Sequence, residues 1–118
     1  MTTDKIRDEL ARRAGWIYEP PQVDGMGAQA RYWWRWTISS EHGGRTYARD
    51  HPMPPTLDGA NSAVPEGWRW GRYPTSFGWV WFVTRPDRPT VEVPDTGDPV
   101  HDLYALALAC VKAGEASR

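Results

Sequence analysis

The eight residues from Arg31 to Ile38 constrain the fold of this chain more than any other segment. Their side chains alternate in character with a period of two, which is typical of a β-strand and incompatible with an amphipathic helix. One face of this strand carries the even-numbered residues, Tyr32, Trp34, Trp36 and Ile38. The other face carries the odd-numbered residues, Arg31, Trp33, Arg35 and Thr37. The chain therefore contains a sheet with an unusual concentration of Trp and Arg.

The segments on either side of this strand predict a loop and a hairpin. Glu19 to Ala30 contains two consecutive prolines and two glycines around Met26, and it predicts a loop. Gly43-Gly44 predicts a hairpin turn, after which Arg45 to Arg49 returns as a second strand. His51 to Pro55 ends that strand, because proline cannot donate a hydrogen bond to the sheet.

Two longer segments predict helices at the ends of the chain. Thr3 to Ala14 has an apolar residue every four positions and a capping threonine before it, and Gly15 is the natural stop. Near the C-terminus, Asp98 is a cap and Pro99 occupies the first helical position, where its missing N–H costs nothing. The residues that follow are almost all apolar up to Lys112, so we expect this helix to be largely buried and to end at Gly114.

The region between Thr56 and Val93 predicts a short helix followed by three strands. Thr56 to Val64 is the helix, and Trp68 to Tyr73 the first strand. Phe77 to Val83 is apolar on both faces, which predicts a strand in the middle of a sheet or beneath a partner. If one of its faces lacks a covering helix, a second subunit would cover it, so both a monomer and a homodimer are compatible with the sequence. Thr90 to Val93 is the closing strand.

Together these segments predict an α+β fold in a single domain, residues 1–118. We expect a small antiparallel sheet of four or five strands, with the N-terminal and C-terminal helices packed on it. The short middle helix is expected at one edge of the sheet. The chain has 118 residues, and two separate cores would leave each half below the usual size for independent folding.

Charge and hydropathy exclude several classes of function. Fourteen basic and fifteen acidic residues give a net charge of -1, so the bulk charge gives no reason to expect nucleic acid or an anionic membrane. No apolar run reaches the roughly 18 residues that span a bilayer, and the N-terminus lacks the apolar core of a signal peptide. One cysteine fits a reducing compartment, and we expect the protein in the cytoplasm.

The reactive side chains do not form a recognisable catalytic or metal-binding motif. The three histidines and Cys110 lack the spacing of a helical metal site. Cys110 lies among apolar residues of the last predicted helix, where a thiol is buried, unreactive and raised in pKa. Gly-rich phosphate loops and the nucleophile elbow are missing from the sequence. We therefore expect no enzyme activity, no catalytic residue, no metal and no cofactor.

Aromatic and arginine side chains are the strongest indication of function. There are eight Trp, and twelve Arg against two Lys. We expect about half of the Trp to fill the core, namely Trp34, Trp36, Trp79 and Trp81. The others alternate with Arg, and stacked Trp and Arg are common at the centres of protein interfaces. The predicted partner-binding residues are Arg31, Trp33, Arg35, Trp70, Arg72 and Tyr73.

Three segments resemble a family of small phage and prophage proteins, the phage α/β/α-sandwich domain group. Thr56 to Trp70 is similar to that family's short helix and Pro-Glu-Gly-Trp turn. Leu103 to Cys110 resembles its final helix, and Leu10 to Trp16 resembles its opening helix. The resemblance covers about half the chain and does not include residues 31–38. It implies a small sheet with helices packed against it and a gene carried by a phage or prophage, but no catalytic residues.

These observations lead to two expectations of function. The first is a non-enzymatic phage or prophage accessory protein that binds a host or phage protein in the host cytoplasm; an inhibitor of a host defence system, such as a CRISPR effector, is one version. The alternative is a module that binds single-stranded nucleic acid or a nucleotide, with bases stacked on Trp and phosphates held by Arg. The net charge of -1 disfavours the alternative.

Overall fold

The computed structural model describes the backbone of residues 1–23, 29–37 and 44–116, and their side chains except those of residues 19–23, 29–32 and 116. This part of the chain contains three helices and six strands, with three strands between each helix and the next. In order they are α1 (Thr3–Arg13), β1 (Ile17–Val23), β2 (Gln29–Thr37), β3 (Gly44–Ala48), α2 (Leu57–Ala63), β4 (Arg69–Thr75), β5 (Gly78–Arg85), β6 (Arg88–Pro94) and α3 (Pro99–Ala116).

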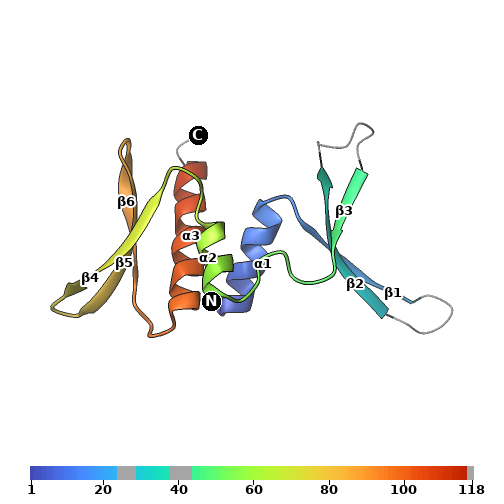
Figure 1. The fold of residues 1–118 in the computed structure, drawn as a ribbon, viewed down its shortest axis with the longest axis horizontal. Helices are drawn as coiled ribbons and strands as arrows, with labels where there is room; N and C mark the ends of the chain where they lie inside the picture. Colours follow the sequence, from blue (N-terminus) through green and yellow to red (C-terminus); the bar gives the residue numbers. More distant parts are fainter. Residues whose placement is uncertain (24–28, 38–43, 117–118) are drawn as a thin grey trace.

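The strands form two separate antiparallel sheets at opposite ends of an elongated molecule (Figure 1). The N-terminal sheet has the order β1-β2-β3 and the C-terminal sheet the order β4-β5-β6, with the helices between them. The molecule measures 60 × 32 × 23 Å along its principal axes. The predicted α+β class is confirmed, but the single sheet of four or five strands is wrong. Each strand pairs only with strands next to it in the sequence. The proline-containing linker, residues 49–56, and α2 separate β3 from β4.

The extra strand, β1, lies partly in the segment that was expected to be a loop. It pairs with β2 at the edge of the N-terminal sheet, and its register shifts between Glu19 and Gln22. Pro20 and Pro21 lie at this shift. Proline is tolerated in edge strands and at irregularities of the ladder, because no hydrogen bond is needed there. The prolines therefore mark an interrupted edge strand, while residues 24–28 of the predicted loop lie outside the described residues.

The first helix forms as its sequence predicts. The Thr2 hydroxyl accepts a hydrogen bond from the Lys5 backbone N–H at 3.3 Å, and Gly15 follows the helix with a φ of +91°. That left-handed conformation is the usual way for a helix to stop at glycine. Ile6 and Leu10 are buried in the central core, and α1 packs against α3.

The last helix covers one face of the C-terminal sheet. The Asp98 carboxylate accepts from the backbone N–H groups of Val100 and His101 at 3.1 and 3.3 Å, which confirms it as the cap. The helix contacts β5 and β6, and Leu103 and Leu106 are fully buried. Gly114 does not end the helix as expected, because it does not adopt a positive φ, and α3 continues to Ala116.

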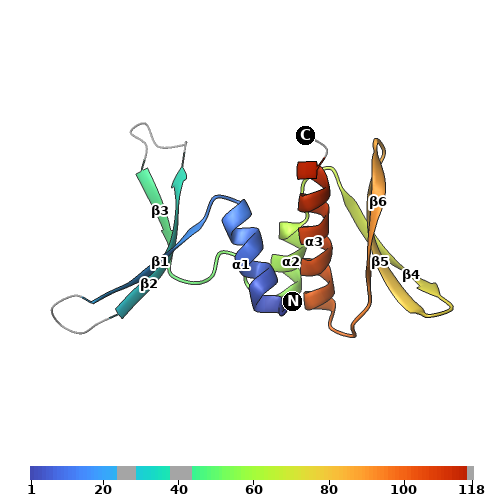
Figure 2. The same ribbon diagram turned by 180° about the vertical axis from the view of Figure 1, so that it is seen from behind.

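The short middle helix lies in the helical layer and not at a sheet edge, so that expectation is wrong. It packs against α3, as the view from behind shows (Figure 2). Thr56 caps it by accepting from the Gly59 N–H at 3.0 Å. A Cβ on Gly59 would lie 2.9 Å from the Tyr104 hydroxyl and 2.8 Å from Cγ of Pro54. The absence of a side chain at Gly59 thus allows the linker and α3 to approach each other.

The hydrophobic core lies between the helices and the C-terminal sheet. The predicted central strand is confirmed, since β5 is the middle strand of its sheet. The expected segment was Phe77–Val83, but Phe77 precedes β5 and is fully exposed, so the segment is not buried on both faces. Trp81 and Val83 of β5 belong to the core together with residues of all three helices. The described residues of the N-terminal sheet contribute nothing to this cluster. The two sheets therefore differ strongly in how much of their surface the helices cover.

Candidate functional site

Reactive groups offer little chemistry within the described residues. No group of three or more His, Cys, Asp or Glu is arranged to hold a metal there. Cys110 is buried, and burial raises the pKa of its thiol to about 11, which confirms its expected character. None of the helices in the described part of the chain combines the length and apolar character needed to cross a membrane.

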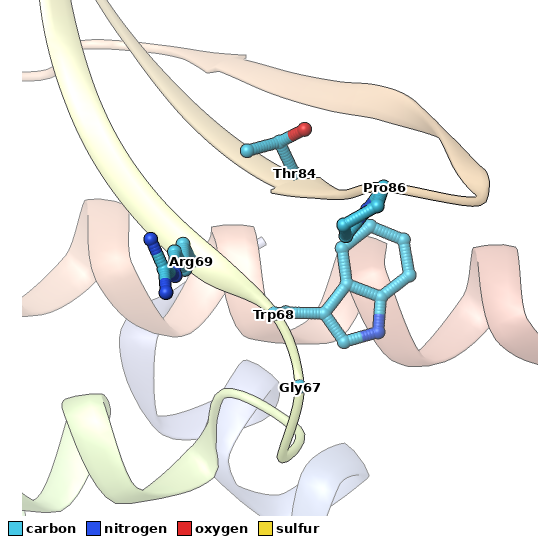
Figure 3. A pocket seen from close by; sticks show the side chains of 5 residues that line it. All are labelled: Gly67, Trp68, Arg69, Thr84 and Pro86. Carbon is cyan, nitrogen blue, oxygen red and sulfur yellow. The ribbon is translucent and has the colours of Figure 1, made fainter.

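A cavity of about 660 Å³ lies at one end of the C-terminal sheet (Figure 3). Its lining comes from the turn before β4, the start of β4 and the end of β5: Gly67, Trp68, Arg69, Thr84 and Pro86. Arg69 is the one charged residue among these five, and Thr84 supplies a single hydroxyl. This lining contains no carboxylate or imidazole to act as a general base.

The predicted site residues of β2 lie on the face of the N-terminal sheet that is turned toward α1. Trp33 is only 7% exposed, and its ring lies 5.2 Å from that of Tyr18 and 4.9 Å from that of His51. Tyr18, Trp33 and His51 line a cavity together with residues of α1. Trp33, which was predicted to bind a partner, is therefore buried against α1 and the linker. The side chain of Arg31 lies outside the described residues.

Arg35, two residues further along β2, is half-buried on the same face. Its guanidinium carbon lies 4.5 Å from the centre of the Trp16 ring, which is a cation–π contact. Its Nε atom is buried and has no hydrogen-bond partner in the part of the chain that the structure describes. Arg35 and Trp16 line a cavity of about 490 Å³ beside Pro52 and Met53 of the linker. Arg35 therefore lies between the N-terminal sheet and the helical layer.

The predicted site residues of β4 lie at the opposite end of the molecule. Trp70 is exposed, and its Nε1 donates a hydrogen bond to Asn61 Oδ1 at 2.6 Å. Tyr73 is also exposed and donates to Glu92 Oε1 at 2.7 Å, and this hydrogen bond raises the pKa of the phenol. Arg72 stacks on the rings of β5. The six predicted residues are therefore not brought together in one site.

The opposite face of the N-terminal sheet carries an exposed aromatic cluster. Strand register places Trp34 beside Ile17 and Tyr47, and Trp36 beside Arg45. Trp36 is 61% exposed, while Ile17 and Tyr47 are each about half exposed. We call this surface the outer aromatic face; its described residues are Ile17, Trp34, Trp36, Arg45 and Tyr47.

The outer aromatic face corrects the expected distribution of tryptophan. Trp36 and Trp79 were expected in the core, but they are 61% and 45% exposed. Trp81 is 5% exposed, as expected of a core residue. The alternation of β2 separates the two faces correctly, but the more apolar face is the one left open. The helices approach from the Trp33 side, where the linker contacts α1.

Arg45 organises the outer aromatic face. Its guanidinium carbon lies 4.1 Å from the centre of the Trp34 ring and 5.4 Å from that of Trp36. The two indole rings are 6.2 Å apart and perpendicular. The predicted turn at Gly43-Gly44 does not account for this pairing, because Gly44 lies in β3 opposite Thr37. A two-residue turn there would pair Arg45 with residue 42 instead of Trp36.

Comparison with known proteins adds no assignment to this geometry. No protein-family model, no curated protein and no solved structure matches the chain. The candidate site is therefore defined by the exposure, stacking and charge of the outer aromatic face.

Proposed function

We propose that this chain is a non-enzymatic phage or prophage accessory protein that acts by binding a macromolecular partner through the outer aromatic face. The observation that carries the proposal is the exposure of Trp36 and Tyr47 beside a stacked arginine on one sheet face. Exposed aromatic clusters of this kind are uncommon on monomeric surfaces and typical of interaction sites. Trp, Tyr and Arg are also the residues that contribute most to binding energy at protein interfaces.

The phage assignment rests on the resemblance of residues 56–70, 103–110 and 10–16 to the phage α/β/α-sandwich group. We propose that the partner is a host or phage protein in the host cytoplasm. Inhibition of a host defence system, such as a CRISPR effector, is the version that we put forward. A protein that works by occupying a surface of its target needs an interface and no catalytic residues.

The proposal is tested by recovering partners from the natural host with matched variants. The Trp36→Ala/Arg45→Ala variant removes the stacked pair from the outer aromatic face. The matched control, Phe77→Ala, removes a fully exposed aromatic ring from the turn between β4 and β5. We expect crosslinking and mass spectrometry to recover a partner with the wild type and the control, but not with the first variant. A partner recovered equally with all three proteins contradicts the proposal.

The predicted patch on the other face requires its own variant. Arg35→Ala is preferable to a Trp33 substitution, because Trp33 is buried and its loss would disturb the fold. If Arg35→Ala abolishes partner recovery while Trp36→Ala/Arg45→Ala retains it, the contact surface is the face toward α1.

A second candidate function is the binding of single-stranded nucleic acid. The specific observation in its favour is the exposed ring of Trp36 beside the positive charge of Arg45. Such binding weakens with salt by about 0.7 log units per log unit of salt for each phosphate contacted. A steep salt dependence of oligonucleotide binding, lost in Arg45→Ala, would favour this function over a protein partner.

A further inference from the structure

The four edge strands of the two sheets differ in how well they are protected against pairing with another strand. The edge of a sheet presents unpaired N–H and C=O groups, and proteins usually interrupt such strands with prolines or bulges, or keep them short. β1 has a register shift between Glu19 and Gln22, and β3 has only 5 residues. β6 contains Pro89 and Pro94 and pairs with β5 across a register shift. Three of the four edges are therefore interrupted or short.

β4 is the edge strand that lacks such an interruption. All 7 of its residues, Arg69–Thr75, pair with β5 in one continuous register. Its single proline, Pro74, lies next to the end of the strand. Among the strands that the structure describes, β4 pairs with β5 alone. Both connections of β4 to its neighbours are described, whereas residues 24–28 and 38–43 connect strands of the other sheet. The second edge of β4 is therefore available for another strand.

The proline-free part of β4 is complementary to itself. It reads Arg69-Trp70-Gly71-Arg72-Tyr73, with Gly71 at its centre. If a second copy of the strand runs antiparallel to the first about a twofold axis at Gly71, Arg69 lies opposite Tyr73 of the second copy. In the same register Trp70 lies opposite Arg72 of the second copy. Residues directly opposite each other in an antiparallel pair point to the same sheet face, with Cβ atoms about 4.5–5.5 Å apart. Every arginine of the pair would thus lie beside an aromatic ring of the other copy, which favours association.

Neighbouring registers are less favourable. An axis at Arg72 places this arginine opposite itself, and like charges directly opposite each other are destabilising. An axis at Tyr73 brings Pro74 into the middle of the new ladder, where it has no N–H to donate. An axis at Trp70 leaves most of the strand unpaired, because β4 begins one residue earlier. The register centred on Gly71 is therefore the one that pairs the whole proline-free stretch without a like-charge contact.

The aromatic side chains of β4 are exposed on the side of the free edge. Trp70 is 42% exposed and Tyr73 37% exposed. The Trp70 ring lies 5.7 Å from the ring of Trp81, and the Tyr73 ring lies 5.8 Å from that of Phe82. Because Trp81 and Phe82 both belong to β5, these contacts come from within the sheet. A second copy would approach both rings from the opposite side.

The centre of this edge permits close approach. Gly71 carries no side chain, and a ring carbon of Phe82 lies 2.8 Å from the position that a Cβ would occupy. An aromatic ring that covers a strand glycine in this way compensates for the missing side chain. On the other face of the sheet, α3 packs mainly on β5 and β6, the two strands farther from this edge. The helix therefore does not stand between the two copies of β4.

We infer that β4 pairs antiparallel with β4 of a second copy of the chain, so that the protein is a homodimer with one continuous sheet. The interface is isologous, with the twofold axis between the two Gly71 residues. Three residues that the sequence predicted to bind a partner, Trp70, Arg72 and Tyr73, lie in this interface. The inference goes beyond the proposed function and does not depend on the partner of the outer aromatic face.

The inference is tested by charge substitutions at one pair of opposite residues. In Tyr73→Arg the new positive charge lies opposite Arg69 of the other copy, so both symmetry-related pairs become repulsive. In Arg69→Glu both pairs lose the cation–π contact. A heterodimer of the two variants has one pair of opposite charges and one native pair of Arg69 with Tyr73. Residues four positions apart in a strand are separated by about 13 Å, so these charges cannot pair within one copy.

Sedimentation equilibrium and native mass spectrometry of the full chain measure the oligomeric state. We expect the wild type to form a species of twice the monomer mass of 13.4 kDa. Tyr73→Arg should raise the dissociation constant of this dimer by about tenfold or more, because it introduces two like-charge pairs. An equimolar mixture of Tyr73→Arg and Arg69→Glu should form heterodimers about tenfold more tightly than either variant forms homodimers. Thr90→Arg is the matched control, since it adds the same charge to the opposite edge strand and should leave the dimer unchanged.

The wild type also supplies a measurement that needs no variant. Alternate N–H groups of β4 point to its free edge, so their hydrogen exchange should be slower at concentrations where the dimer forms than after dilution. A wild type that stays monomeric up to about 1 mM overturns the inference. A dimer that is unaffected by Tyr73→Arg, lost in Thr90→Arg, or not restored by mixing the two variants overturns it as well.

Discussion

The two sheets are alike in size, topology and central motif, but they are stabilised by different interactions. The C-terminal sheet is packed against α3, with Trp81 and Val83 enclosed in the core. The N-terminal sheet turns Trp33 toward the helices and leaves Trp36 in solvent. Each sheet has an arginine stacked on two tryptophans of its middle strand, Arg45 on Trp34 and Trp36 and Arg72 on Trp79 and Trp81, an arrangement we call a Trp–Arg bridge. Whether the second Trp of a bridge is buried depends on whether a helix packs on that face.

The helices next to the two sheets explain the difference. Apart from Asp102, the buried residues of α3 are apolar, and the helix packs against β5 and β6 of the C-terminal sheet. The first helix meets the N-terminal sheet mainly through the linker that follows β3. Asp8 pairs with His51 at 2.8 Å, and the Arg7 guanidinium donates to the Met53 carbonyl at 2.6 Å. Polar and cation–π contacts of this kind fix a position but bury little apolar surface.

The largest expected contrast between the two bridges is in the stability of their second tryptophans. Trp81→Ala removes a buried ring and should lower the free energy of unfolding by about 3–5 kcal/mol. Trp36→Ala removes an exposed ring and should lower it by about 1 kcal/mol or less. Urea unfolding followed by circular dichroism measures both values. Equal losses would contradict the proposed distinction between a core bridge and a surface bridge.

The junction between the two halves can be tested at Gly59. Gly59→Ala places a methyl group against Pro54 and Tyr104, and overpacking of this kind should cost about 1–3 kcal/mol of stability. Gly114→Ala is the matched control, because it lies in α3 with open space around it and should stabilise by about 0.5–1 kcal/mol. Thermal unfolding reports both changes. If Gly59→Ala leaves the melting temperature unchanged, the close contact between the linker and α3 is not required for stability.

The two arginines of the bridges should contribute similar, smaller amounts. An exposed cation–π contact is worth about 0.5–1 kcal/mol, so Arg45→Ala and Arg72→Ala should each reduce stability by about that amount. Tryptophan fluorescence should change in both variants, since each arginine lies on two indole rings. A loss well above this range for Arg45 alone would show that the N-terminal sheet depends on its bridge for folding.

The smallest expected effect is a difference in acid sensitivity. The hydrogen bond from Trp81 lowers the pKa of Asp95 below its ordinary value of 3.8. A lowered folded-state pKa gives stability that is complete above the unfolded-state pKa and is lost as the pH falls through the folded-state value. Asp95→Asn should therefore flatten the dependence of stability on pH below about pH 4. An unchanged acid profile in this variant would show that Asp95 is not the group responsible.

Much of the local structure was predictable because its signals are local. The cap at Asp98, the stop at Gly15 and the central position of β5 each depend on a few neighbouring residues. Pro20 and Pro21 obscured β1, because a strand at an edge tolerates prolines that a central strand does not. Gly114 is a similar case: glycine permits a helix to end, but α3 continues through it.

The candidate site was less predictable, although the sequence already placed Trp34 and Trp36 on one strand face. The alternation of residues 31–38 assigns Trp34 and Trp36 to one face and Trp33 and Arg35 to the other, which the structure confirms. The partner-binding role of the predicted residues stays a prediction. The alternation could not predict which of the two faces α1 and the linker would pack against.

Apart from β1, the sequence by itself determined which segments become helices or strands and which side chains share a strand face, because these follow from backbone periodicity and capping. The tertiary structure decided that the strands form two sheets, and which face of each sheet is covered. Those outcomes depend on packing between segments far apart in the chain: His51 with Asp8 fixes the N-terminal sheet on one side, and α3 closes the C-terminal sheet. Two nearly identical Trp–Arg bridges therefore differ in exposure for a reason that lies outside their own residues.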